Sequence, residues 1–445
     1  MAHRYFPHTP DDVDKMLERC GARTLDDLYS DVDPSLRLKK PYDLPGPLSE
    51  PELRRFFDGL DAENRTLTCF AGGGYYDHYT PAAVNAILAR SEFLTAYTPY
   101  QPEISQGTLQ YIFEYQSMMC ELTGMDVSNA SMYDGATATA EAMLMAVNSA
   151  RRKNRVLISA TVNPAVASVC TTYARYHGIA LEVIPDHAGV TDRAEFEAMM
   201  GAGDVAGVIV GYPNYYGIVE DYDGFADICH AAKALFIMNC QASTLGVLRT
   251  PASLGADIVC GDAQSLGMPL NYGGPYLGYM CTTKALIRKM PGRIVGATTD
   301  DHGQRVFVLT LQAREQHIRR EKATSNICSN QGLMALHTAV YLSLLGAGGL
   351  REVNELGYGG LRYLIECMAE TGVMKVKHPD KPFINECLME IADGYTADRI
   401  IETAAAEGIL AGVKVDEHQL LVAVTEQQSK ADIDRYVSIV KNMQP

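Results

Sequence analysis

A turn of small residues ahead of an apolar segment is the first candidate for anion binding. Asp134-Gly135-Ala136-Thr137 precedes the alanine- and methionine-rich residues 136–149, which predict a buried helix. Backbone N–H groups at a helix start attract a phosphate, and Thr137 adds a hydroxyl donor. A capped helix whose small residues allow close packing would have the same sequence, so that alternative stays open.

A hydroxyl-rich aromatic loop is the second candidate. Residues 95–107 contain Tyr97, followed by Tyr100 and Gln101 between two prolines, with a single carboxylate. Loops held by a rigid scaffold often line ligand pockets, although a packed surface loop fits these residues as well. Pro-Asn-Tyr-Tyr-Gly at 213–217 follows a predicted strand, and ligands in open parallel sheets lie beyond the carboxyl ends of strands.

The most polar central stretch, residues 312–326, concentrates positive charge in an acidic chain. The stretch contains four cations and two glutamates, and a solvated helix face is the ordinary explanation for such a run. The change to Thr-Ser-Asn-Ile-Cys before a strongly apolar segment suggests instead that the basic end turns inward. In that case it would hold an anion or a partner. The four cations are Arg314, Arg319, Arg320 and Lys322.

Other chemistry has little support in the sequence. The 11 histidines are dispersed, so we expect no metal, and no serine lies in a G-x-S-x-G elbow. The 11 cysteines include no C-x-x-C pair, which fits a reducing compartment. A net charge of −16 disfavours nucleic-acid binding. Apolar runs such as 205–210 are strand-sized and the N-terminus lacks a signal core, so we expect a cytoplasmic protein and no membrane span.

The elements that must position these residues follow from patterning along the 445-residue chain, which is 47% hydrophobic. Residues 1–65 carry too few apolar side chains for a core of their own and many prolines, which predicts an arm lying on something else. Residues 66–345 alternate helices with near-continuous apolar strands, which predicts a mostly parallel sheet covered on both faces. Residues 346–445 predict a small α/β domain. The predicted strands of the large domain are 155–159, 181–184, 205–210, 234–238 and 257–260.

Three stretches carry a family resemblance: residues 97–110, 129–145 and 312–331 resemble the glycine cleavage system P-protein. The likeness extends from the Arg-Tyr-Phe-Pro-His-Thr start to the C-terminal domain. The chain matches the N-terminal half of the long fused form, which is subunit 1 of the split, two-gene version. The resemblance implies a pyridoxal-phosphate fold type I architecture, similar to aspartate aminotransferase, with a large sheet domain and a small C-terminal α/β domain.

The resemblance also implies a reaction in glycine catabolism. Glycine dehydrogenase (decarboxylating), an oxidoreductase, decarboxylates glycine with pyridoxal phosphate and transfers the aminomethyl group to the lipoyl arm of H-protein. This chemistry needs a lysine that binds the cofactor and an acidic partner for the pyridinium nitrogen. Residues 234–283 contain no lysine. Alignment by eye with the family's lysine-bearing subunit puts Gln264 or Ser265 at the lysine position and Gln241 at the aspartate position.

The resemblance therefore implies a division of labour. Subunit 2 is expected to supply the lysine and to bind pyridoxal phosphate, in an α2β2 heterotetramer, so that this chain is inactive alone. The turn Gly135, Ala136 and Thr137 would be a remnant that binds no phosphate. The catalytic residues of this chain stay unknown; candidate contributors to the partner's site are Tyr97, Tyr100, Gln101, His78, Arg314 and His317.

Two alternatives remain open at this point. The chain could be a scaffold or regulatory subunit that stabilises the lysine-bearing subunit without contributing to chemistry. It could also be a self-sufficient enzyme with Lys322 as an unusual cofactor anchor, although an ion-pairing role in a charged helix suits Lys322 better.

Overall fold

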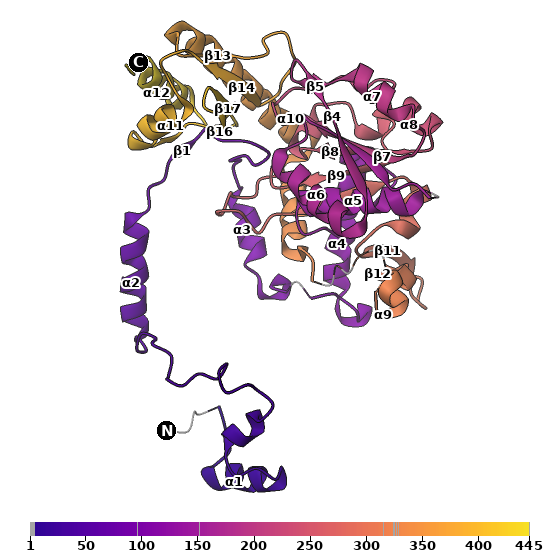
Figure 1. Ribbon diagram of the computed structural model, residues 1–445, viewed down its shortest axis with the longest axis vertical. Coiled ribbons are helices and arrows are strands. Elements are labelled where there is room, and N and C mark those ends of the chain that lie inside the picture. Colours follow the sequence, from indigo (N-terminus) through magenta and orange to yellow (C-terminus); the bar gives the residue numbers. More distant parts are fainter. Residues whose placement is uncertain are drawn as a thin grey trace. The chain divides into compact units, whose positions relative to one another are not determined.

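The computed structural model describes residues 5–95, 97–150, 152–314, 316–323, 325, 327 and 329–444 (Figure 1). The chain divides into two compact units, Met1–Arg65 and Thr66–Pro445. Part of the polar stretch, including Glu315, Thr324 and Asn326, lies outside the described residues, as does the side chain of Lys322.

The first unit is an arm of short helices. Its helical elements are α1 (Pro10–Arg19), η1 (Leu25–Tyr29) and α2 (Glu50–Glu63). Each begins with a hydroxyl residue three positions before an acidic one, and the two form a capping box. Among the described residues of this unit, Leu17 is the one buried hydrophobic side chain. Local capping rather than a core therefore fixes these helices.

The second unit is built on a seven-stranded sheet in the order β2-β10-β9-β8-β7-β3-β4. Five neighbouring strands, from β9 to the edge strand β4, run parallel, and β10 and β2 join antiparallel at the other edge. The strands are β2 (Val127–Ser128), β3 (Arg155–Ser159), β4 (Ala180–Ile184), β7 (Val205–Tyr212), β8 (Leu235–Cys240), β9 (Ile258–Asp262) and β10 (Gly278–Thr282).

Both faces of this sheet are buried, which explains why its strands are almost continuously apolar. Along β7, Val208 and Val210 pack into one core cluster and Ile209 packs into the other. Helices α5 (Gly135–Ser149) and α6 (Pro164–His177) cover the face of Ile209. The opposite face is covered by α4 (Gln106–Thr123), α7 (Arg193–Met200), α8 (Phe225–Ala231) and the first half of α10 (Gly332–Thr371).

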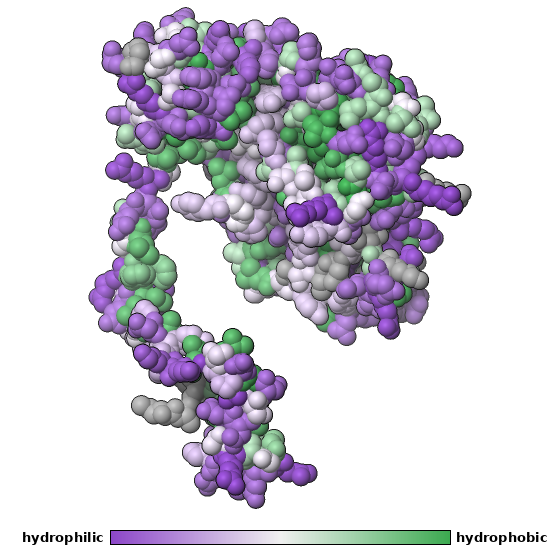
Figure 2. Space-filling view, viewed as in Figure 1, coloured by the Kyte–Doolittle hydropathy of each residue, from purple (hydrophilic) through white to green (hydrophobic). Residues whose placement is uncertain are grey.

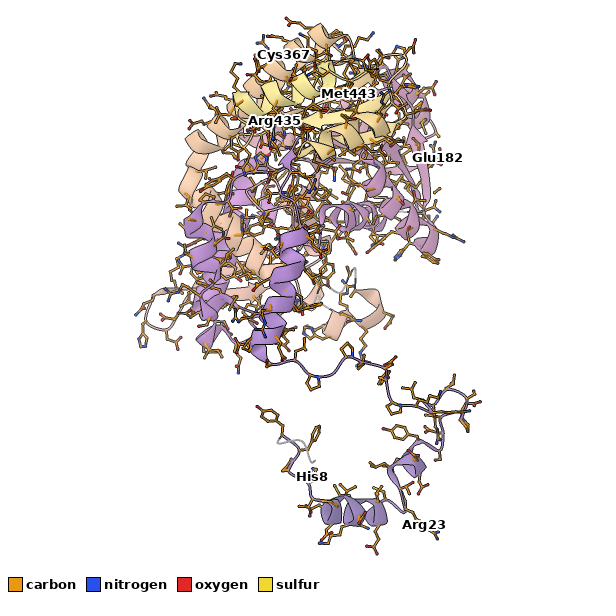
Figure 3. The ribbon with its side chains drawn as sticks, turned by 90° about the vertical axis from the view of Figure 1, so that its left-hand side faces the viewer. His8, Arg23, Glu182, Cys367, Arg435 and Met443 are labelled. Atoms are coloured by element: carbon orange, nitrogen blue, oxygen red, sulfur yellow. The ribbon has the colours of Figure 1, made fainter. Side chains whose placement is uncertain are left out.

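A smaller layer follows the kink of α10 at Gly346, whose φ is 61°. Its antiparallel sheet has the order β13-β14-β17-β16. Figure 1 shows these strands grouped with α11 and α12, and Figure 3 labels Arg435 and Met443 at that end of the chain. The elements are β13 (Met374–Val376), β14 (Glu386–Ile391), α11 (Ala397–Ala406), β16 (Val413–Asp416), β17 (Gln419–Ala423) and α12 (Lys430–Lys441).

Shorter elements connect these layers. Thr68 and Cys69 (β1) pair in parallel with Ile409 and Leu410 (β15), and Phe70 packs in the core of the small layer before the chain enters the large one. The remaining elements are α3 (Ala82–Leu88), η2 (Ser91–Phe93), η3 (Pro102–Ile104), β5 (Asp186–His187), β6 (Val190–Thr191), η4 (Ser243–Gly246), η5 (Pro251–Leu254), η6 (Lys284–Lys289), β11 (Ile294–Thr299), β12 (Arg305–Thr310), η7 (Gln312–Arg314), α9 (Gln316–Arg319) and η8 (Arg320–Lys322).

The predicted fold class is confirmed: the protein is an α/β protein with a large, mostly parallel sheet and a small C-terminal α/β layer. The limits 1–65, 66–345 and 346–445 for three domains stay a prediction. Among the described residues, one helix, α10, is long and apolar enough to cross a membrane by length and composition alone. Buried core helices meet the same criterion, and Leu336, Ala339 and Leu361 of α10 lie in the core.

One glycine contact between α10 and the turn after β9 allows a direct stability test. Gly267 has a φ of 77°, and a Cβ there would lie 2.3 Å from the Tyr341 ring. We predict that Gly267→Ala lowers the free energy of unfolding by about 3 kcal/mol or more, from backbone strain plus the clash. Urea denaturation measures this value.

Gly303→Ala is the matched control, because Gly303 has a φ of 76° with open space around its Cβ position. It should cost about 1 kcal/mol, from backbone conformation alone. Equal losses at the two sites would contradict the packing of Tyr341 against Gly267.

Candidate functional site

The candidate site is a cavity of about 70 Å³ at the carboxyl ends of the parallel strands β7, β8 and β9. This is where ligands bind in open α/β sheets. The start of α5, the loop after β1 and the first residue of β14 complete its wall. The cavity is lined by Gly74, Tyr75, Tyr76, Gly135, Ala136, Asn163, Val166, Gly211, Pro213, Asn214, Tyr215, Asn239, Cys240, Gln241, Asp262 and Glu386.

The predicted anion turn lies on this cavity, but its donors already serve two carboxylates. The N–H of Thr137 donates to Asp134 Oδ1 at 2.8 Å, and the N–H of Gly135 donates to Asp262 Oδ2 at 3.0 Å. The Thr137 hydroxyl lies 3.1 Å from Asp134 Oδ2. The helix start is thus occupied by the chain's own acids, so a phosphate there would meet the Asp134 carboxylate and find few open donors.

Asp262 is held in place from both sides. Its Oδ1 accepts the N–H of Gln264 at 2.8 Å, and burial raises its pKa to about 7. A Cβ at Gly135 would lie 2.6 Å from the Asp262 nitrogen, so β9 and the start of α5 are in direct contact. The carboxylate is therefore an integral part of the turn.

Both residues at the expected lysine position are buried and make structural hydrogen bonds. The Gln264 amide accepts the N–H of Tyr76 at 2.8 Å and donates to the carbonyls of Tyr76 and Met268 at 2.8 and 2.6 Å. Ser265 Oγ accepts the N–H of Ser243 at 3.0 Å. Neither residue lines the cavity. The position that would carry an amine instead fastens the Tyr76 loop to the large sheet.

Gln241, at the position expected to face a pyridinium nitrogen, does line the cavity. Its amide nitrogen donates to Ser243 Oγ at 3.2 Å and to Asn385 Oδ1 at 3.4 Å. An amide carries no charge, so it cannot stabilise a protonated ring nitrogen as an aspartate does.

A second buried acid, Glu386, closes the cavity from the small layer. Its Oε1 accepts the N–H of Gly73 at 2.6 Å and its Oε2 accepts the Tyr76 hydroxyl at 2.8 Å. Burial raises the pKa of Glu386 to about 7. Together with Gln264, this carboxyl fixes the loop from Gly73 to Tyr76 between the two layers.

The cavity residues do not fit pyridoxal phosphate. The phosphate turn faces Asp134 and Asp262, the lysine position is filled by Gln264 and Ser265, and an amide replaces the acidic partner. None of the cavity-lining residues that the structure describes is a lysine, arginine or histidine. We therefore derive no reaction step within this cavity.

The aromatic loop lies outside this cavity, against Arg293. Arg293 donates to the Tyr100 hydroxyl at 2.6 Å and its guanidinium carbon lies 5.2 Å from the centre of that ring. Tyr97 packs edge-on against Tyr100 and is 68% exposed, while Tyr100 is 44% exposed. Gln101 is also exposed. The loop thus presents aromatic surface from a fixed base.

Arg314, from the basic stretch, contacts the backbone next to Arg293. Arg314 donates to the carbonyl of Gly292 at 2.9 Å and also to that of Met290, so its guanidinium is held by the backbone just before Arg293. His317 lies exposed on α9. The structure thus brings Tyr97, Tyr100 and Arg314 into one region through the segment from Met290 to Arg293.

His78 lies apart from that region, at the junction with the small layer. Its Nδ1 and Glu426 Oε2 are 2.8 Å apart, and its Nε2 is buried without a described partner. Burial opposes ionisation of Glu426, but the hydrogen bonds from His78 and from the N–H of Tyr79 lower its pKa. His78 therefore helps to anchor the loop that Gln264 and Glu386 also hold.

Sequence reasoning missed Asp262, Glu386 and Arg293. Asp262 follows a predicted strand, and its position at a carboxyl strand end was a usable signal. Glu386 and Arg293 had no local signal, because their partners are far away in the sequence. The 213–217 loop was correctly expected beyond a strand end, since Pro213, Asn214 and Tyr215 line the cavity.

Comparison with known proteins gives one consistent result. The family model of the glycine cleavage system P-protein matches residues 3–440. A curated relative from Anoxybacillus flavithermus, named probable glycine dehydrogenase (decarboxylating) subunit 1, is 46% identical over 444 residues, which cover 98% of each chain. A relative of the same name from Moorella thermoacetica is also 46% identical and covers 99% of each chain.

Among solved structures, a glycine decarboxylase (P-protein) of the glycine cleavage system in inhibitor-bound form superimposes with a TM-score of 0.88. It is 40% identical, and the match covers 99% of each chain. An alanine–glyoxylate aminotransferase from Nostoc reaches a TM-score of 0.61 at 15% identity, over 92% of this chain and 97% of that one, which shows a shared fold alone.

Asp262 should make stability depend on pH. Its pKa in the folded chain, about 7, lies above the ordinary 3.8, so the native state keeps a proton that the unfolded chain releases. The resulting stabilisation is present near pH 4 and is lost as the pH rises through 7. We predict that Asp262→Asn costs about 2 kcal/mol more at pH 5 than at pH 8.

Urea denaturation at the two pH values measures this difference. The exposed Asp301→Asn is the control and should show nearly the same cost at both. An equal cost of Asp262→Asn at pH 5 and pH 8 would contradict the buried, proton-binding state of Asp262.

Proposed function

This chain belongs to the glycine cleavage system P-protein family, and we propose that it is the subunit of glycine dehydrogenase (decarboxylating) that lacks the cofactor-binding lysine. In this proposal, subunit 2 binds pyridoxal phosphate, which supplies the electron sink for decarboxylation of glycine. The aminomethyl group then passes to the lipoyl arm of H-protein. An α2β2 heterotetramer in the cytoplasm is the working form, and this chain is inactive alone.

The occupied positions of the phosphate and of the lysine support this role most strongly. Asp262 accepts the N–H of Gly135 at 3.0 Å, at the helix start where the fold would otherwise hold a phosphate. The amide of Gln264, at the expected lysine position, is fully used by backbone partners. A chain built in this way needs another subunit to hold the cofactor.

The contribution of this chain is to complete the partner's site from outside. Tyr97 and Tyr100 are exposed on a loop whose base is pinned by Arg293, so the loop can order a substrate or exclude water without being reordered itself. Arg314 acts by holding the backbone at Met290 and Gly292. Gln101, His78 and His317 remain candidate contributors to the same partner site.

A scaffold that leaves the chemistry entirely to subunit 2 is the second candidate. The observation in its favour is that buried hydrogen bonds to neighbouring groups occupy the polar side chains at the positions of cofactor binding. The two candidates differ in what the exposed aromatic loop does during turnover.

Mixing the subunits tests the division of labour. We predict that glycine–bicarbonate exchange is absent with this chain alone and appears when it is mixed with subunit 2, because this chain lacks a cofactor site of its own. Each subunit is assayed separately and together at matched concentrations. Full exchange by this chain without subunit 2 would overturn the proposal.

Removing the aromatic loop's side chains tests direct participation. Tyr100→Phe deletes the hydroxyl that Arg293 binds, so the loop loses its fixed position. We predict that this variant and Tyr97→Ala each lower kcat of the assembled complex by about tenfold or more, with the complex still formed.

Tyr176→Ala is the control, since Tyr176 is 78% exposed on α6. It should leave kcat unchanged. Unchanged turnover in the Tyr97 and Tyr100 variants, with normal assembly, would instead favour the scaffold candidate.

A further inference from the structure

The N-terminal arm exposes far more large apolar side chains than a chain segment in water ordinarily does. Figure 2 shows hydrophobic surface along it, and Figure 3 labels His8 and Arg23 beside its first helix. The exposed side chains are Tyr5, Phe6, Met16, Leu25, Leu28, Tyr29, Leu36, Leu38, Tyr42, Leu44, Leu48, Leu53, Phe56, Phe57 and Leu60. Scattered single exposed residues need no explanation, but a run of this density marks an interaction surface.

Helix α2 concentrates this surface on one face. Leu53, Phe56, Phe57 and Leu60 follow the i, i+3, i+4, i+7 spacing, and each is between 44% and 57% exposed. The two phenylalanine rings lie edge to face with centroids 5.4 Å apart. The opposite face carries charges, among them Arg55 and Asp58. This arrangement is that of a helix that lays one apolar stripe into a groove.

The arm's helices also carry caps that favour helix formation on a partner. The side chains of Thr9 and Asp12 cap α1, those of Thr24 and Asp27 cap η1, and Ser49 with Glu52 caps α2. Prolines between them restrict the connecting path. A short helix without tertiary contacts is marginal in water, and such caps lower the cost of ordering it on a partner.

The amount of apolar surface suits a permanent interface. Half-exposed side chains of this number and size present on the order of 1,000 Å². That is about what one partner contributes to a standard stable interface, and more than a brief encounter with a carrier protein buries. The names of the curated relatives imply a second subunit. A subunit of the same enzyme is a permanent partner, which fits an interface of this size.

We infer that the arm, residues 5–63, is a docking element that binds the second subunit, with the α2 stripe of Leu53, Phe56, Phe57 and Leu60 seated in an apolar groove of that subunit. This inference rests on the proposed function, because it takes the second subunit as the occupant. In this inference the arm supplies the binding affinity for the second subunit, and residues of the second unit (Thr66–Pro445) contribute to the reaction.

Binding of the full chain to subunit 2, measured by analytical ultracentrifugation, tests this. Phe56→Ser with Phe57→Ser should weaken the complex by about a hundredfold, since two central aromatic anchors are lost. Arg55→Ser with Asp58→Ser is the matched control, because it places two serines on the opposite face of the same helix with unchanged net charge, and it should change affinity by less than about threefold. Equal affinity of the phenylalanine variant and the wild-type chain would overturn the inference.

Hydrogen exchange of the α2 amides identifies the occupant. We expect fast exchange in the chain alone and strong protection once subunit 2 is added. Protection already present in the isolated chain, whether from its own body or from a second copy, would overturn the inference. So would protection that appears only with H-protein.

The two proposals fail differently. If the wild-type chain does not bind subunit 2 at all, the proposed function fails and the docking inference fails with it. If the wild-type chain and the phenylalanine variant assemble equally well and show equal glycine–bicarbonate exchange, only the docking inference fails.

Discussion

The side-chain amide of Gln264 is the interaction on which the rest of the site depends. It pairs with both the N–H and the carbonyl of Tyr76, and it is fully buried. Losing either bond would leave a buried backbone group unpaired, at a cost of about 1–3 kcal/mol each. A lysine offers donors but no acceptor, so it cannot replace this amide. The position where the cofactor-binding lysine was expected thus stabilises the fold instead.

Neighbouring polar side chains hold the same loop that Gln264 binds. The loop from Gly73 to Tyr79 is bound by Gln264 on the large layer and by Glu386 and Glu426 on the small one. Asp262 closes the remaining gap at the start of α5. The wall of this cavity is therefore held by buried acids and amides, while Tyr97 and Tyr100 stay exposed on the aromatic loop. This layout is what the proposed sharing of work with a second subunit rests on.

The sequence predicted the large sheet well because each central strand is buried on both faces and reads as an apolar run, as 205–210 within β7 does. It missed the hairpin of β11 and β12, whose strands bury only Ile294, Val295 and Phe307. The family resemblance showed that a lysine is missing from residues 234–283, but the sequence did not show which contacts the residues there make instead. Gln264 and Tyr76 are 188 positions apart, and Glu386 is 310 from Tyr76, so no local pattern revealed their contacts.

In the proposed division of labour, subunit 2 alone carries pyridoxal phosphate. This claim is tested most directly by reducing the assembled, active complex with borohydride in saturating pyridoxal phosphate and weighing each subunit by intact mass spectrometry. The account predicts that the mass of one reduced pyridoxal phosphate is added to subunit 2 alone. The same mass added stoichiometrically to this chain, at any of its lysines, would contradict it.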